Sequence, residues 1–76
     1  MNNVTIFDNG ACFMLCVNGL MTYGFSTLGD AWRHIAWIYR VAQQQFTVGK
    51  SHTPVKQWLD GMIMAGYLDA DDGFRQ

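Results

Sequence analysis

Residues 9–19 read NGACFMLCVNG, an apolar run with an Asn-Gly pair at each end. An Asn-Gly pair between apolar segments is typical of a two-residue type I′ hairpin turn, in which both central residues adopt positive φ angles. The two pairs therefore predict a three-stranded antiparallel meander over residues 3–25, with strands at about 3–7, 11–17 and 20–25.

Two-residue turns also predict which strand residues face each other. Phe7 would face Cys12 across the first turn, and Met14 would face Tyr23 across the second. One face of the sheet would then carry Val4, Ile6, Phe13, Leu15, Val17 and Leu20. The other would carry Phe7, Cys12, Met14, Cys16, Met21, Tyr23 and Phe25.

Both predicted faces of the meander are apolar, whereas a sheet packed on one side shows polar residues on the other. We therefore expect the second face to be covered by a helix, by a second copy of the chain or by a partner. If no helix covers it, the candidate dimer or second contact face consists of Phe7, Met14, Met21 and Tyr23. The alternative is that these four residues belong to the ordinary hydrophobic core and are covered by one of the helices.

Downstream of the meander, apolar residues recur at helical spacing. A first helix is expected over residues 27–44, with Thr27 as its N-cap. Asp30 falls in the first turn, where a carboxylate offsets the helix dipole. These features predict that the chain turns directly from the third strand into a helix.

A second helix is expected over residues 53–65, with Thr53 as N-cap and Pro54 at the first helical position. Gly66 lies just past its predicted end, as glycine commonly does. Between the helices, residues 46–48 fit either a short fourth strand or a packed loop. Two helices after the meander indicate a βββαα order.

The chain is thus predicted to be one α+β domain spanning residues 1–76, with a polar tail at 69–76. Its composition is half hydrophobic and 14% charged, against about 25% charged in average soluble proteins. A domain this small cannot bury three Trp, five Phe, three Tyr and five Met completely. Exposed apolar surface in a soluble protein commonly marks a binding site.

Charge and hydropathy limit the classes of binding partner and the cellular compartment that we expect. The formal net charge of −1 gives no electrostatic footprint for non-specific nucleic-acid binding. No run of about 18 apolar residues indicates a membrane span, and the start Met1-Asn2-Asn3 lacks the features of a secretory signal. We therefore expect a cytoplasmic protein with reduced thiols at Cys12 and Cys16.

No motif predicts an enzyme, a metal site or a cofactor. The candidate metal ligands do not follow a zinc-binding spacing: Cys12, Cys16, His34 and His52. Ser51 and His52 are adjacent, so their side chains point apart rather than forming a nucleophile and base pair. A glycine-rich phosphate loop after a strand is also missing. The interpretation is a non-enzymatic protein.

The best candidate contact surface is the outer stripe of the first predicted helix, formed by Arg33, Trp37, Arg40 and Gln44. Trp and Arg are enriched in interface hot spots because each combines a large contact area with polar groups. The alternative is that Trp37 packs against the Phe46 segment and leaves the two arginines solvated. The stripe predicts a protein partner.

Residues 54–68, PVKQWLDGMIMAGYL, followed by Asp72-Gly73-Phe74-Arg75, resemble the recognition helix and wing of winged-helix DNA-binding domains. That resemblance implies nucleic-acid binding, and the candidate contacts are Lys50, His52, Lys56 and Arg75. The sequence departs from this family between Gln45 and Pro54, which leaves no room for the helix that normally precedes a recognition helix.

Residues 4–42 combine an Asn-Gly hairpin with the helix entry FSTLGDA at 25–31. This half resembles the opening of small phage and mobile-element proteins, the anti-CRISPR inhibitors among them. The resemblance implies an inhibitor or adaptor that binds and occludes a complex in the cytoplasm of the bacterial host cell. Protein binding is the favoured function, nucleic-acid binding is the alternative, and a homodimeric structural subunit is a third possibility.

Overall fold

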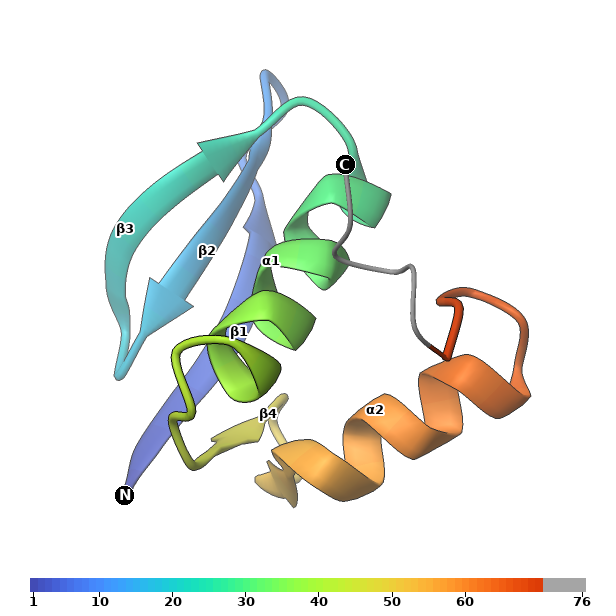
Figure 1. Ribbon diagram of the computed structural model, residues 1–76. Coiled ribbons are helices and arrows are strands. Elements are labelled where there is room, and N and C mark those ends of the chain that lie inside the picture. Colours follow the sequence, from blue (N-terminus) through green and yellow to red (C-terminus); the bar gives the residue numbers. More distant parts are fainter. Residues whose placement is uncertain (71–76) are drawn as a thin grey trace.

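Five strands form one mixed sheet in the computed structural model, which describes residues 1–70 (Figure 1). The elements are β1 (Asn2–Asp8), β2 (Phe13–Val17), β3 (Leu20–Phe25), α1 (Leu28–Arg40), β4 (Phe46–Val48), β5 (Thr53–Pro54) and α2 (Val55–Met64). The strand order is β3-β2-β1-β4-β5. The predicted α+β class, meander and two helices are confirmed, but the sheet is wider than predicted. Most of the predicted tail, residues 71–76, lies outside the described part.

A short hairpin of β4 and β5 extends the sheet beyond β1. β4 runs parallel to the beginning of β1, with Val4 opposite Val48, and β5 pairs antiparallel with β4. The hydroxyl of Thr47 donates to Asn3 Oδ1 at 2.6 Å, and Asn3 Nδ2 donates to the carbonyl of Gly49 at 3.1 Å. These bonds join segments more than forty residues apart, so no local sequence pattern could predict them.

The two Asn-Gly pairs form different turns. Asn18 and Gly19 have φ angles of 53° and 86°, which confirms the predicted second turn. The first connection is a four-residue loop, residues 9–12, because Asp8 pairs with Phe13. Asn9 Oδ1 accepts hydrogen bonds from the amides of residues 11 and 12, which stabilises this longer loop. The first predicted register was therefore wrong by two residues, a shift that leaves the faces of β1 and β2 unchanged.

A β-bulge at Thr22 changes which way β3 faces. Cys16 is opposite Met21, but Leu15 is opposite Tyr23, so Thr22 is an extra residue on β3. Its hydroxyl donates to the carbonyl of Leu15 at 3.0 Å. The bulge turns Tyr23 and Phe25 onto the face of Leu15. The prediction that they share a face with Met14 was wrong.

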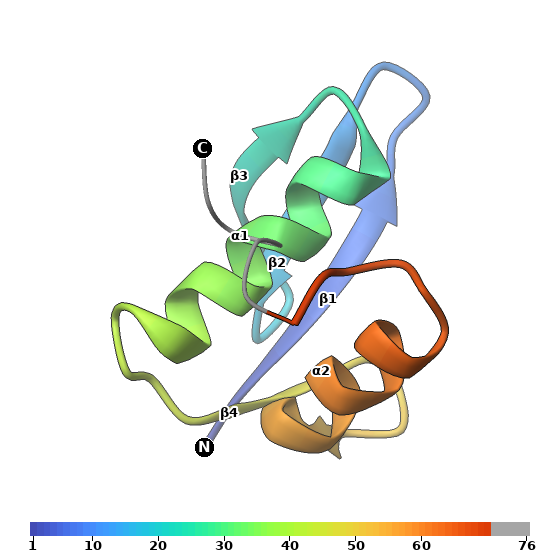
Figure 2. The same ribbon diagram turned by 45° about the vertical axis from the view of Figure 1, so that its right-hand side comes forward.

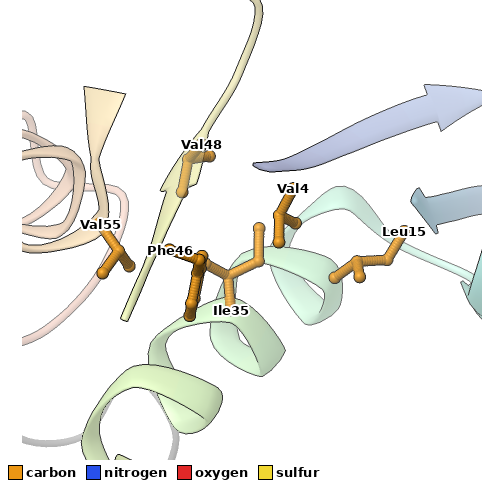
Figure 3. Close-up of a cluster of buried hydrophobic side chains, with 6 residues drawn as sticks. All are labelled: Val4, Leu15, Ile35, Phe46, Val48 and Val55. Atoms are coloured by element: carbon orange, nitrogen blue, oxygen red, sulfur yellow. The ribbon is translucent and has the colours of Figure 1, made fainter. Parts of the chain in front are cut away.

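Both helices pack on the same face of the sheet (Figures 1 and 2). The main core cluster joins β1, β2, β4 and α1 to the first residue of α2 (Figure 3), and consists of Val4, Leu15, Ile35, Phe46, Val48 and Val55. A second cluster of Ala36, Leu59 and Leu68 lies between the helices, and Tyr39 and Trp58 pack against both clusters. No helix within residues 1–70 covers the opposite face, which we call the uncovered face.

α1 begins where predicted but is shorter. The N-cap Thr27 accepts a hydrogen bond from the Asp30 amide at 3.1 Å, which confirms the predicted cap. The helix ends at Arg40 rather than at residue 44, and Gln43 has a positive φ of 56°. Gln44 therefore lies beyond the helix, in the connection to β4.

α2 starts two residues later than predicted, at Val55. The prediction of Thr53 as its N-cap was wrong. Thr53 lies in β5, where it pairs with Val48 of β4, and Pro54 occupies the cap position without a side-chain hydrogen bond. The helix ends at Met64, one residue before the predicted end, and the predicted glycine stop at Gly66 is confirmed. Gly66 adopts a φ of 86°, and its amide and that of the next residue donate to the carbonyls of residues 63 and 62.

Candidate protein-binding site

Four rings from β3 and α1 form one cluster, which we call the aromatic patch: Tyr23, Phe25, His34 and Trp37. The imidazole of His34 lies at its centre. It stacks on Trp37 with 5.8 Å between ring centroids and 11° between planes. It also meets Tyr23 edge-on at 4.8 Å and Phe25 at 5.3 Å. Each ring therefore restricts the orientation of its neighbours.

Local backbone geometry places these rings together. The bulge at Thr22 turns Tyr23 and Phe25 toward α1. His34 and Trp37 are three residues apart on α1, so they project from the same side of the helix. Tyr23 is 53% exposed and Trp37 is 41% exposed, whereas Phe25 and His34 are partly buried beneath them. The patch thus presents two exposed rings on an ordered base.

Of the predicted helix stripe, Arg33 and Trp37 lie on the exposed outer side of α1. Arg33 Nη1 donates to Asp30 Oδ1 at 2.8 Å, and both side chains are about half exposed. The guanidinium of Arg40 donates to the carbonyl of Ala70 instead. Gln44 lies beyond the helix end. The structure therefore places Arg33 near Trp37 and separates Gln44 from them.

The alternative position for Trp37, against the Phe46 segment, is not the one it takes. Phe46 is 4% exposed and belongs to the main core cluster, whereas Trp37 stacks on His34 at the surface. Sequence reasoning identified Trp37 but missed Phe25 and His34 as its neighbours. The sequence contains one local signal for this cluster, the three-residue spacing between His34 and Trp37. It contains no signal for the bulge at Thr22 that brings the rings of β3 next to them.

The uncovered face carries three of the four residues predicted for a second contact. Phe7 and Met21 are 51% and 61% exposed, and Met14 is partly buried. Met14 pairs with Phe7 across the sheet, and its sulfur lies 3.4 Å from the sulfur of Cys12. Tyr23 belongs to the aromatic patch instead. The predicted face therefore divides into two separate surfaces.

The residues predicted for nucleic-acid contact lie around the β4–β5 turn and the start of α2. Lys56 pairs with Asp60 at 3.4 Å, and His52 Nδ1 meets the Lys50 carbonyl at 3.1 Å. Arg75 is outside the described residues. The segment before α2 forms strands rather than the helix that precedes a winged-helix recognition helix. This end of the molecule is mixed in charge.

Within residues 1–70, the candidate metal ligands are placed apart from one another, and so are the Ser51 and His52 side chains. No three His, Cys, Asp or Glu side chains in this part lie close enough to hold a metal ion. Ser51 Oγ lies 2.9 Å from Thr53 Oγ1, whereas His52 points to a carbonyl, so this turn does not couple a nucleophile to a base. None of the described helices is long and apolar enough to cross a membrane.

The aromatic patch should make stability depend on pH. Burial lowers the pKa of the His34 imidazole below 6.5, because the charged form loses solvation. The unfolded chain then binds a proton more readily than the folded one as the pH falls below about 6.5. We expect the thermal midpoint to be highest above that value and to drop progressively as the pH falls below about 6.5.

The control is His34→Phe, which keeps a ring in the patch and removes the titration. This variant should show a flatter dependence of the thermal midpoint on pH over the same pH range. An equally steep fall in His34→Phe would assign the pH dependence to other groups.

Comparison of this chain with models of protein families, with curated proteins and with solved structures found no match.

Proposed function

We propose that the protein is a small non-enzymatic inhibitor or adaptor that binds another protein through the aromatic patch. The observation that supports this most directly is that Tyr23 and Trp37 are exposed and yet held in place by His34 and Phe25. Tyr and Trp dominate binding energy at protein interfaces. Rings that are already ordered lose little further freedom on binding, which favours affinity.

The surroundings of the patch fit a protein interface. Arg33 and Asp30 lie on the same outer side of α1 and supply a charged rim around apolar rings, which is the usual anatomy of such interfaces. The uncovered face, with Phe7, Met14 and Met21, offers a second apolar area for the same partner or for a second copy of the chain. Two apolar surfaces on a chain with 14% charged residues favour protein association.

The resemblance of residues 4–42 to small phage proteins suggests the biological setting. In our proposal the protein acts in the cytoplasm of a bacterial host, as anti-CRISPR-like inhibitors do, and blocks a host complex by occlusion. Nucleic-acid binding ranks lower, because Lys56 is paired with Asp60 and the net charge is −1. A steep loss of affinity for DNA with added salt would reverse that order.

The experiment is affinity capture from a bacterial lysate with the wild-type protein and two variants, read by mass spectrometry. Trp37→Ala should lose the captured partner, because truncating an interface hot spot costs about 2 kcal/mol or more, roughly 30-fold in affinity. Met64→Ala removes a side chain that is 88% exposed on α2 and should capture as wild type does.

Circular dichroism should show both variants folded. Arg40→Ala is unsuitable as a test, because Arg40 contacts Ala70 and its loss can affect the fold. Equal capture by wild type and Trp37→Ala would remove the aromatic patch as the binding site.

A further inference from the structure

The second half of β1 has no neighbouring strand on one side. β4 pairs only with the first residues of β1, up to Val4 (Figure 2). The amide of Gly49 donates to the Val4 carbonyl at 2.8 Å, and the chain then turns away at Gly49, whose φ is 85°. Within the described chain, residues 5–8 therefore have β2 on one side and an open edge on the other.

The backbone of this open edge offers hydrogen-bonding groups at Ile6 and Asp8. The bond from the Asn18 amide to the Asn3 carbonyl, at 2.8 Å, shows that Asn3 points toward β2. Alternate residues of an antiparallel strand point the same way. Residues 5 and 7 therefore bond to β2, and Ile6 and Asp8 direct their N–H and C=O groups to the open edge. No backbone bond from residues 1–70 reaches them there.

A cavity of about 360 Å³ lies beside this edge, and we call it the β1 edge groove. Its walls include Ile6, Phe7, Trp32, Val48, Lys50 and Trp58. Trp32 comes from α1 and Trp58 from α2, so the helices form the sides of the groove. Neither indole N–H donates to an acceptor within residues 1–70. The groove is lined mainly by apolar side chains.

One charged residue lines the groove and another lies just beyond it. Lys50 lines the end near Val4, and its ammonium has no ion-pair partner in the described chain. Asp8 ends β1 beyond the other end, and its exposed carboxylate accepts a hydrogen bond from the Gly10 amide at 2.9 Å. A segment that bound antiparallel to β1 would complement these charges if it carried a basic residue near its start, opposite Asp8. It would also need an acidic residue near its end, opposite Lys50.

We propose that the β1 edge groove binds an extended segment of a partner protein, which adds a strand beside residues 5–8 of β1. The segment would pair with the backbone of Ile6 and Asp8, place an apolar side chain between Trp32 and Trp58, and place an acidic side chain on Lys50. Strand addition of this kind takes its affinity from main-chain hydrogen bonds and its specificity from alternate side chains.

This site is separate from the aromatic patch. Trp32 and Trp37 are five residues apart on α1, so they point in different directions around the helix. Trp32 contacts Tyr67 at 5.2 Å, whereas Trp37 contacts His34. Loss of one site therefore does not imply loss of the other, and the Trp37→Ala variant serves as a control here.

The probe is a capped synthetic peptide, Lys-Thr-Val-Thr-Glu, whose charged ends and central valine project to the same face of an extended strand. Its binding is followed by amide shifts in NMR spectra of the full-length protein. We expect saturable shifts at the Ile6 and Asp8 amides, and the same shifts in Trp37→Ala. The charge-reversed peptide, Glu-Thr-Val-Thr-Lys, should bind several-fold more weakly. A peptide with N-methyl groups on its strand-pairing amides should not bind.

The matching protein variant is Ile6→Pro. It removes the N–H that faces the groove and leaves the β1–β2 hydrogen bonds intact, as proline at an open strand edge can. We expect about a tenfold loss of peptide affinity, the equivalent of one or two hydrogen bonds. Lys50→Ala should reduce the preference between the two charge orders to the part that Asp8 contributes. If Ile6→Pro does not fold, the N-methylated peptide makes the same test on the wild-type protein.

Three results would overturn the proposal. The first is the absence of saturable shifts at Ile6 and Asp8 with either peptide, and the second is binding that survives N-methylation. The third is a dimer in light scattering that Ile6→Pro dissociates, because the occupant of the groove would then be a second copy of the chain.

Discussion

Leu15→Ala should lower the free energy of unfolding by about 3 kcal/mol, whereas Met14→Ala should lower it by about 1 kcal/mol or less. Leu15 is completely buried between the sheet and α1, so its truncation leaves a cavity in the main core cluster. Met14 is partly buried on the uncovered face, where solvent can fill the space. Urea titration followed by circular dichroism gives both values.

The two variants are matched because Met14 and Leu15 are consecutive residues of β2. Their side chains point to opposite faces of the sheet, Leu15 to the core and Met14 to the uncovered face. A loss of 3 kcal/mol is a large part of the about 5–15 kcal/mol that stabilises a typical domain. If Met14→Ala were as destabilising as Leu15→Ala, both faces of the sheet would be packed, and the one-sided architecture would be wrong.

Trp58→Ala should also lower the free energy of unfolding by about 3 kcal/mol. Trp58 packs against both core clusters, so its truncation weakens the contact of α2 with the sheet and with α1 at once. The measurement is again urea titration. Met64→Ala, on the same helix and 88% exposed, should change stability by less than about 0.5 kcal/mol.

A small effect of Trp58→Ala would mean that α2 is held mainly by Val55 and Leu59, the two buried residues of that helix. The expected loss is also the reason that Trp58 is not used to test the β1 edge groove. A variant that changes stability and removes a groove wall at the same time cannot separate the two roles.

Local signals predicted most of the fold correctly. The Asn18-Gly19 turn, the Thr27 cap and the Gly66 helix end each depend on a few neighbouring residues, and all three are confirmed. The first turn was predicted wrongly because the Asn9 side chain accepts two backbone hydrogen bonds and stabilises a longer loop. β5 was not predicted because its two residues depend on pairing with β4.

The candidate site was predicted in part for a similar reason. Trp37 and Arg33 stood out as an aromatic and a basic residue on one helix stripe, a pattern that helical spacing alone reveals. Tyr23 was assigned to the wrong face, because the extra residue at Thr22 reverses the alternation of β3. Periodicity cannot locate a bulge, and the aromatic patch depends on one.

The central claim is that the aromatic patch is the surface that a protein partner covers. Hydroxyl-radical labelling of the free protein and of its complex, read residue by residue by mass spectrometry, tests it most directly. Tyr23 and Trp37 should become much less reactive in the complex, and Met64 should stay as reactive as in the free protein. Protection of Met64 with unchanged reactivity at Tyr23 and Trp37 would contradict the claim.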